Sequence, residues 1–229
     1  MSFTEAAMAA KHIEHDVRIP IDTILLKGTL ALPAEAFGAV LFAHGSGSSR
    51  FSPRNTAVAQ VLRRAGLGTL LFDLLTEDED AVYETRFDIE LLAHRLVATT
   101  RWFMDQPGTR HLPVGYFGAS TGAAAALQAA AELGPAIGAV VSRGGRPDLA
   151  GPFLDRVRAP TLLLVGGHDE PVIELNREAY DRLASDKELV IIPGATHLFE
   201  EPGTLEEVAR LTAQWFTRHL RAHQASTPR

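Results

Sequence analysis

Cysteine is absent from all 229 residues of the chain, which excludes a cysteine nucleophile, a disulfide scaffold and a thiolate metal site. No apolar run approaches the roughly 18 residues that a membrane-spanning helix needs, and residues 1–16 lack the apolar core of a signal peptide. Basic residues form no stripe, and the net charge is −6, which argues against a nucleic-acid partner. We therefore expect a cytoplasmic protein that binds neither nucleic acid nor membrane.

The composition is that of a globular protein, because hydrophobic residues make up 46% of the chain. A chain of this length is sufficient for one α/β domain, which should bury roughly 70–75% of its unfolded surface. We assign residues 15–222 to this single domain, residues 1–14 to a loosely attached leader and residues 223–229 to a tail.

Apolar runs alternate with amphipathic segments along most of the chain. Residues 16–21 and 23–32 are predicted to pair as a hairpin around Asp22, and the acidic stretch 77–80 is interpreted as a solvated loop. Further strands are predicted at 39–43, 68–75, 112–117, 137–141, 161–165 and 188–192, and helices at 53–65, 86–106, 123–132, 171–184 and from 204 onwards. This alternation predicts a mostly parallel sheet with helices on both faces. Ligands in such sheets bind beyond the carboxyl ends of the strands.

The pentapeptide G-A-S-T-G at residues 118–122 lies between a predicted strand and an alanine-rich helix. A G-x-S-x-G pattern at such a junction is typical of a nucleophile elbow, in which a strained turn presents the serine. The flanking glycines suit a turn too close-packed for side chains. A short motif also arises by chance, and Ser120 could simply cap the helix, so the rest of the chain has to decide.

An acid and a base follow Ser120 at later strand ends. Asp169 follows the strand 161–165, and His197 follows the strand 188–192. Ser, Asp, His is the chain order of an α/β-hydrolase triad. Imidazole has an ordinary pKa near 6.5, so it is available as a base at neutral pH, and the carboxylate would orient it. Asp169 alone could also be a helix cap, and Asp73, at the end of another strand, is the alternative acid.

The oxyanion of an acyl-transfer intermediate needs backbone N–H donors. We expect one from Thr121, the residue after the nucleophile, and one from Ser46 in the glycine-rich loop after the strand 39–43. His44, at the start of that loop, is interpreted as shaping it. No metal site and no cofactor are expected, since the histidines have no matching ligands at suitable spacing and the loop lacks the phosphate-binding pattern G-x-x-x-x-G-K-[ST].

These motifs resemble those of the α/β-hydrolases, specifically the dienelactone hydrolase-like group. The resemblance covers about residues 17–220 and rests on His44-Gly45, G-A-S-T-G at 118–122, G-H-D-E-P-V at 167–172 and G-A-T-H-L-F at 194–199. It implies an eight-stranded sheet whose second strand is antiparallel to the rest, and a cofactor-free ester or lactone hydrolase. Dienelactone hydrolases proper use a cysteine nucleophile. The serine found here therefore favours a carboxylesterase-type activity.

The substrate is expected to be a small soluble ester or lactone, because the short gap between 141 and 161 leaves no room for a cap domain. Arg50 in the oxyanion loop and Arg143 after a strand are candidates to hold an anionic substrate, since arginine binds carboxylates bidentately. Arg146 lies nearby. Surface or loop-tethering salt bridges are the alternative role for all three arginines.

Three functions fit the sequence. The first is a serine hydrolase of carboxylic esters or lactones. The second is an acyltransferase or perhydrolase that uses the same triad, because another nucleophile can intercept an acyl-enzyme. The third is a non-catalytic binding domain of the same fold, since a fold does not determine a function.

Overall fold

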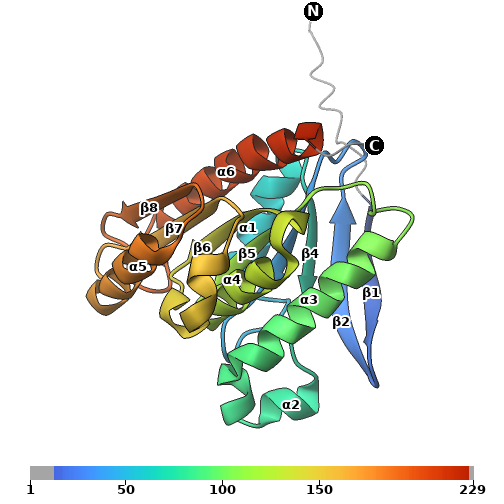
Figure 1. Ribbon diagram of the computed structural model, residues 1–229, viewed down its shortest axis with the longest axis horizontal. Helices are drawn as coiled ribbons and strands as arrows, with labels where there is room; N and C mark the ends of the chain where they lie inside the picture. Colours follow the sequence, from blue (N-terminus) through green and yellow to red (C-terminus); the bar gives the residue numbers. More distant parts are fainter. Residues whose placement is uncertain (1–12, 227–229) are drawn as a thin grey trace, which may run out of the picture.

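The computed structural model describes residues 13–226 and shows a twisted sheet between two layers of helices (Figure 1). The strands are β1 (Ile13–Ile21), β2 (Ile24–Leu32), β3 (Ala39–Ala43), β4 (Gly68–Phe72), β5 (Val114–Ala119), β6 (Ile137–Arg143), β7 (Thr161–Gly166) and β8 (Lys187–Ile192). The α-helices are α1 (Pro53–Arg64), α2 (Glu77–Ala81), α3 (Ile89–Asp105), α4 (Thr121–Leu133), α5 (Glu170–Arg182) and α6 (Thr204–Ser226), and the short 3₁₀ helices are η1 (Glu84–Phe87), η2 (Gly134–Ala136) and η3 (Pro147–Arg156).

The eight strands form one sheet in the order β1-β2-β4-β3-β5-β6-β7-β8. Strand β2 is antiparallel to both of its neighbours, and from β4 to β8 all pairs are parallel. The predicted sheet is therefore confirmed, including its antiparallel second strand. The hairpin also forms as expected, with Asp22 at a φ of 50° in the turn.

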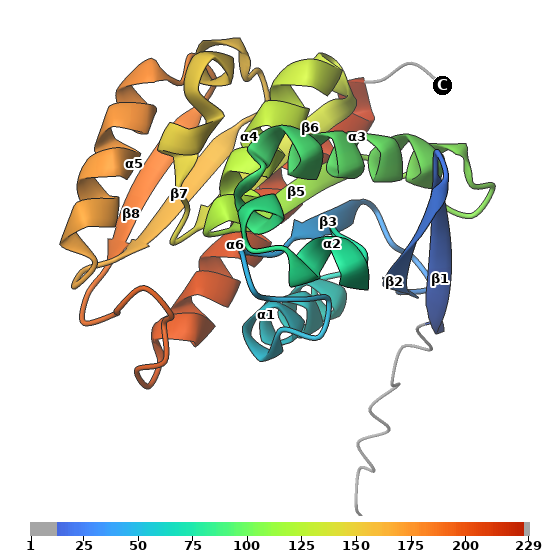
Figure 2. The same cartoon turned by 90° about the horizontal axis from the view of Figure 1, so that it is seen from below.

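Helices cover both faces of the sheet: α3, α4 and α5 lie on one face and α1 and α6 on the other (Figure 2). Alternate residues of the central strand β3 contribute to the two cores, so that Leu41 packs on the α3–α4 side and Phe42 on the α1–α6 side. Both are almost fully buried. A strand covered on both faces must be apolar throughout, which is why β3 is a continuous apolar run.

The prediction of a loop at 77–80 is wrong, because these residues form helix α2. Thr76 and Glu79 make a reciprocal cap: the Glu79 N–H donates to the Thr76 hydroxyl at 3.2 Å, and the Thr76 N–H donates to Glu79 Oε2 at 2.9 Å. Acidic side chains also stabilise the first turn of a helix. The sequence contains this capping pattern at Thr76 and Glu79, next to the run of acidic residues that favoured the prediction of a loop.

Other elements differ from the prediction at their ends. Helix α3 begins at Ile89 and not at residue 86, because the Asp88 side chain accepts a hydrogen bond from the Leu91 N–H at 3.0 Å and caps the helix there. Strand β1 begins at Ile13, opposite Leu32, so the predicted leader is too long by two residues. Its remainder, residues 1–12, lies outside the described residues.

The predicted tail also differs, because α6 continues to Ser226 with no glycine or proline to stop it earlier. Residues 227–229 lie outside the described range. Within residues 13–226 no helix is both long and apolar enough to cross a lipid bilayer.

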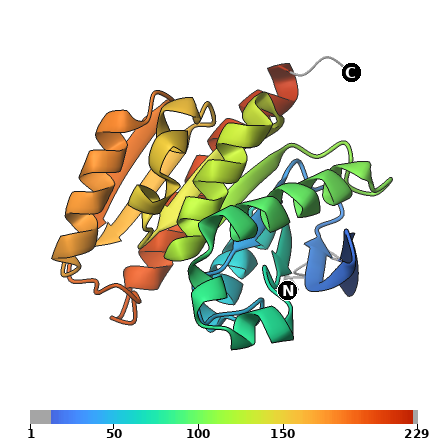
Figure 3. The same ribbon diagram turned by 60° about the horizontal axis from the view of Figure 1, so that its bottom comes forward.

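No cap domain is inserted between β6 and β7, since that connection contains only η3 (Figure 3). The carboxyl ends of the central strands are therefore covered by short loops. The side chains that follow β3, β5, β7 and β8 meet at this edge of the sheet.

Candidate active site

Ser120 lies between the last residue of β5 and the first residue of α4, and its backbone adopts φ 51° and ψ −122°. A positive φ is rare for a residue with a side chain and is unfavourable by about 1–3 kcal/mol. The Ser120 side chain makes no capping hydrogen bond to α4. Ser120 therefore does not act as a side-chain cap of α4.

The two glycines of the pentapeptide permit this turn. A Cβ atom at Gly118 would lie 2.5 Å from the Ala123 Cα atom, and one at Gly122 would lie 2.2 Å from the Ala43 carbonyl oxygen. These distances are far below van der Waals contact, and the obstructing atoms are backbone. The strand, the turn and β3 can approach one another only because both positions lack a side chain.

His197 and Asp169 form a hydrogen bond between the loops that follow β8 and β7. The His197 Nδ1 atom lies 2.6 Å from Asp169 Oδ2. Asp169 is the N-cap residue of α5, but its side chain makes no capping bond, so the carboxylate serves the imidazole and not the helix. When the His197 Nδ1–H donates to the Asp169 carboxylate, the Nε2 atom of the neutral ring is left as a hydrogen-bond acceptor.

Ser120 and His197 line the same cavity, which has a volume of about 230 Å³. Ser46, Arg54, Asn55 and Arg143 also line it. The cavity thus brings together the serine, the histidine and the oxyanion loop, which the sequence separates by about 150 residues in all.

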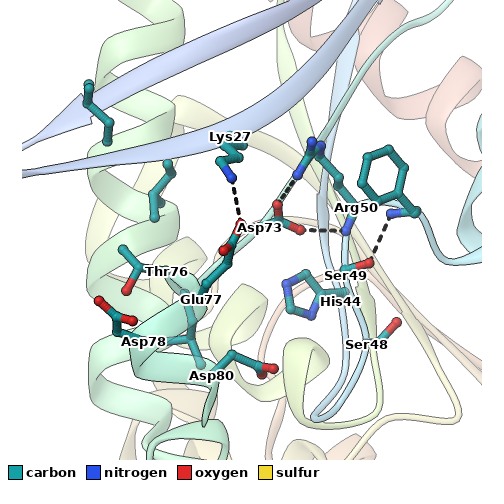
Figure 4. A pocket seen from close by; sticks show the side chains of 14 residues that line it. Lys27, His44, Ser48, Ser49, Arg50, Asp73, Thr76, Glu77, Asp78 and Asp80 are labelled. Carbon is teal, nitrogen blue, oxygen red and sulfur yellow. Dashed lines mark hydrogen bonds and ion pairs between the residues drawn. The ribbon is translucent and has the colours of Figure 1, made fainter.

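Asp73, the alternative acid, lies elsewhere. Its Oδ1 atom accepts the Arg50 backbone N–H at 2.8 Å, and its other oxygen forms an ion pair with the Arg50 guanidinium. These two residues line a separate, larger cavity of about 360 Å³ together with Lys27, Glu77 and His44 (Figure 4). Asp73 therefore anchors the loop and is not the partner of His197.

His44 fastens the same loop to the end of β4. Its Nε2 atom accepts the Leu74 N–H at 3.0 Å, and its Nδ1 lies 3.0 Å from the Gly45 carbonyl oxygen. Both bonds are satisfied only by a neutral ring with its proton on Nδ1. Burial lowers the pKa of His44. The expected role of His44, shaping the loop, agrees with these contacts.

The predicted oxyanion donors lie side by side. Thr121 is the first residue of α4, where backbone N–H groups have no partner within the helix. The Ser46 N–H donates to the Thr121 side-chain oxygen at 2.9 Å. A substrate oxyanion that used the Ser46 N–H would have to displace this hydroxyl.

The three arginines singled out in the sequence have different surroundings. Arg50 is paired with Asp73, and Arg146 makes two bonds to Asp148, at 2.9 and 2.7 Å. Arg143 lines the cavity that Ser120 lines, is only 6% exposed and has no carboxylate within ion-pair distance among residues 13–226. The tethering role thus fits Arg50 and Arg146, while Arg143 remains uncompensated.

Arg54 and Asn55 also line this cavity, although the sequence did not single them out. Residues that directly follow strands are the ones expected at a site of this kind, whereas these two belong to the first turn of α1. A usable signal was present in Ser52-Pro53, which marks a helix start directly after the oxyanion loop. The described residues contain no group of three or more histidine, aspartate or glutamate side chains that could hold a metal ion.

Comparison with known proteins identifies similar chains. The model of the family described as "Dienelactone hydrolase family" matches residues 57–222. The crystal structure of a dienelactone hydrolase from Anabaena variabilis is 57% identical, with a TM-score of 0.90, over 92% of this chain and 99% of that one. Est1E from Butyrivibrio proteoclasticus has a TM-score of 0.77 at 18% identity over 90% of this chain and 99% of its own, which is a likeness of fold.

A protein of Mycobacterium tuberculosis with the name "Putative phosphoribosyl transferase" is 56% identical over 207 residues. The match covers 90% of this chain but 47% of that protein. The chain thus spans about half the length of this curated relative, and the relative's name describes a longer protein.

Proposed function

Since the chain belongs to the dienelactone hydrolase family, we propose that it is a serine hydrolase that cleaves carboxylic esters or lactones through an acyl-enzyme on Ser120. The observation that carries this proposal is that His197, which is hydrogen-bonded to Asp169, lines the same cavity as Ser120. A nucleophile, a base and an orienting acid in this order are the parts that acyl transfer requires.

The first half of the reaction forms the acyl-enzyme. The Ser120 oxygen attacks the carbonyl carbon of the ester while His197 Nε2 takes the hydroxyl proton. Asp169, bonded to Nδ1, stabilises the imidazolium that results. The carbonyl oxygen becomes an oxyanion, which the Thr121 N–H stabilises together with the Ser46 N–H, after the oxyanion has displaced the Thr121 hydroxyl from the Ser46 N–H. The C–O bond to the alcohol then breaks, and His197 returns the proton to the leaving oxygen.

The second half regenerates the serine. A water molecule gives its proton to His197 and attacks the acyl carbon, the same N–H groups stabilise the second oxyanion, and Ser120 leaves with the proton. Water reaches this site readily, since no cap domain covers the carboxyl ends of the strands. An open site supports hydrolysis over transfer to another acceptor.

The size of the cavity supports a small substrate. Its volume of about 230 Å³ is below the roughly 300–1,000 Å³ of sites that enclose drug-sized ligands. We expect acetyl and butyryl esters and small lactones to react, and long-chain acyl esters to react poorly.

Labelling with a fluorophosphonate tests the proposal directly, because this reagent modifies only serines that a neighbouring base activates. We expect mass spectrometry to find the adduct on Ser120, and 4-nitrophenyl acetate to be hydrolysed. Ser120→Ala should abolish both signals. A folded protein, checked by circular dichroism, that is neither labelled nor able to hydrolyse any ester of a short panel would contradict the proposal and favour a binding role.

A further inference from the structure

Arg143 is a buried cation in the catalytic cavity without a counter-charge. It is the last residue of β6, beside Ala119 of β5. The nearest hydrogen-bond partner of its guanidinium is the Asn55 amide oxygen at 3.5 Å, and its Nε has no partner. Burial first, and then the charge of Arg54, lower the pKa of Arg143 to about 10, which leaves it protonated at neutral pH. A buried and unpaired charge is unfavourable by several kcal/mol, so an anionic ligand would be strongly favoured there.

Arg54 brings a second cation to the same wall. It belongs to the first turn of α1, which begins after the cap Ser52 and contains no acidic residue. Its only ion-pair partner among the described residues is Glu200 at 3.1 Å. The Glu200 side chain is 64% exposed, so it can turn away into solvent at little expense. The Arg54 Nε, like that of Arg143, is buried without a partner.

These side chains converge on the amino-terminal end of a twelve-residue helix. Helix amino termini carry a partial positive charge and bind anions. The wall therefore combines two guanidinium groups, the Asn55 amide and a helix start, all lining the cavity that Ser120 lines.

We propose that this wall is a subsite for a phosphate group carried by the substrate, so that the preferred ester or lactone is a phosphorylated one. The inference rests on the proposed hydrolase function. The phosphate takes no part in the reaction: the bonds formed and broken are those of the acyl group on Ser120, and the phosphate holds the substrate in place.

The charge balance favours phosphate over carboxylate. Two guanidinium groups and a helix terminus supply more than one positive charge, and a carboxylate would compensate only one of them. A phosphate monoester carries a charge of about −1.5 to −2 near neutral pH and three acceptor oxygens. These oxygens can accept from donors that approach from α1 and from β6 at the same time.

Binding to the inactive variant Ser120→Ala tests the subsite without catalysis. We expect titration calorimetry at pH 8 to show phenyl phosphate binding at least about tenfold more tightly than benzoate, and phenol binding weakest; tenfold corresponds to about 1.4 kcal/mol. Adding Arg143→Lys or Arg54→Gln should weaken phenyl phosphate about tenfold or more. The control is Arg50→Gln, because Asp73 holds the Arg50 guanidinium in the neighbouring cavity. Adding this change should leave the affinity for phenyl phosphate within about twofold.

The conservative Arg143→Lys change keeps the buried charge but removes the planar fork, and Arg54 lies at a partly exposed position, so a folded protein is expected in both cases. Benzoate binding as tightly as phenyl phosphate would overturn the proposal in favour of a carboxylate site. Phenyl phosphate affinity that neither change reduces, or that Arg50→Gln reduces equally, would also overturn it.

A kinetic comparison separates this inference from the proposed function. Acetyl release from 1-acetylglycerol 3-phosphate and from 1-acetylglycerol is followed in a pH-stat. We expect the phosphorylated ester to have a kcat/KM at least about tenfold higher, and this ratio to fall towards one in Arg54→Gln. Hydrolysis of both esters at equal rates would refute the subsite and leave the hydrolase proposal standing. Hydrolysis of neither, in a protein that fluorophosphonate does not label and that hydrolyses no ester of the panel, would refute the hydrolase proposal, while the calorimetry would still decide the subsite.

Discussion

Two cavities lie on either side of the loop that joins β3 to α1, and they differ in how their charges are compensated. In the larger cavity, of about 360 Å³, Arg50 is paired with Asp73 and Lys27 with Glu77 at 2.6 Å. In the smaller, of about 230 Å³, Arg143 has no acidic partner within the described residues, and His197, which is hydrogen-bonded to Asp169, lines the cavity together with Ser120.

This difference shows why volume alone is a poor guide to a site. The two cations of the larger cavity, Lys27 and Arg50, are each paired with a carboxylate, which leaves no uncompensated positive charge there, among the described residues, for an anionic ligand. The smaller cavity stores strain at Ser120 and an unpaired cation at Arg143. Unfavourable features of this kind persist where a protein has a use for them.

The largest difference is expected between Asp169, which is bonded to His197, and Asp73, which lines the larger cavity. Asp169→Asn should lower kcat for 4-nitrophenyl acetate about 10³–10⁴-fold, because the amide cannot hold the Nδ1–H tautomer of His197 or stabilise the imidazolium. Asp73→Asn should lower it less than about tenfold, since Asp73 contacts the loop only through Arg50. Steady-state kinetics of both variants provides the measurement. Equal losses in the two variants would mean that Asp73 matters as much to the reaction as Asp169 does.

An added methyl group should be tolerated less well at Gly122, next to Ser120, than at Gly108. Gly122→Ala places a methyl group 2.2 Å from the Ala43 carbonyl oxygen, and we expect a loss of about 3 kcal/mol or more in the free energy of unfolding. Gly108→Ala is the control, because a Cβ there meets nothing within 4 Å, and its effect should stay within about 0.5 kcal/mol. Urea unfolding measures both. An elbow that accepts the methyl group without loss of stability would show that the turn is looser than these contacts imply.

The paired arginine of the larger cavity should affect stability and not specificity. Arg50→Gln breaks the ion pair with Asp73, whose side chain is 19% exposed, and we expect a loss of roughly 1–3 kcal/mol in the free energy of unfolding. The ratio of kcat/KM for 1-acetylglycerol 3-phosphate to that for 1-acetylglycerol should remain within about twofold of the wild-type ratio. A large fall in that ratio would mean that the phosphate binds in the larger cavity, beside Arg50, and not beside Arg143.

The smallest expected effect is a pH dependence of stability that originates at His44, which lines the larger cavity. Burial lowers its pKa in the folded protein below the ordinary 6.5, while the backbone carbonyl of Gly45 and the charges of Asp73 and Asp80 oppose this in part. The unfolded chain therefore binds the proton more readily. The contribution of neutral His44 to the free energy of unfolding is therefore complete above pH 6.5 and is lost as the pH falls below that value.

His44→Gln, which retains an acceptor for the Leu74 N–H, should remove this contribution. Urea unfolding at pH 7.5 and 5.5 is expected to show a steeper loss of stability in the wild type than in the variant. The pKa of His219 is also lowered, chiefly by burial, but His219 is present in both proteins and cancels in the comparison. Parallel losses in the two proteins would mean that His44 is not a source of the pH dependence.

The order of strands and helices could be read from the sequence because each depends on local pattern. The strands β3, β5, β6 and β7 are apolar runs of the length that a doubly covered strand requires. Helix α1 was predicted with its cap, since Ser52-Pro53 is a local start signal, and the Ser52 side chain does accept the Asn55 N–H. The errors fell where two local signals competed, as at the charged and capped segment of α2.

The candidate site was predicted in part for the same reason. Ser120, Asp169 and His197 follow strands directly, so the rule that parallel strands end at one edge was enough to bring them together. Their catalytic roles remain a proposal. Arg54 escaped this rule because it lies on a helix, and the different surroundings of Arg50 and Arg143 could not be seen in a sequence that shows three similar arginines.

The sequence by itself determined the alternation of elements, the strained turn at G-A-S-T-G and the order of serine, acid and histidine, because these depend on residues adjacent in the chain. Only the tertiary structure decided which charges are compensated. Asp73 lies 23 residues from Arg50, and Asn55 lies 88 residues from Arg143. Electrostatic compensation depends on distance in space and on burial, and the tertiary fold places Arg143 in a buried position beside Asn55, with no carboxylate of the described residues within ion-pair distance.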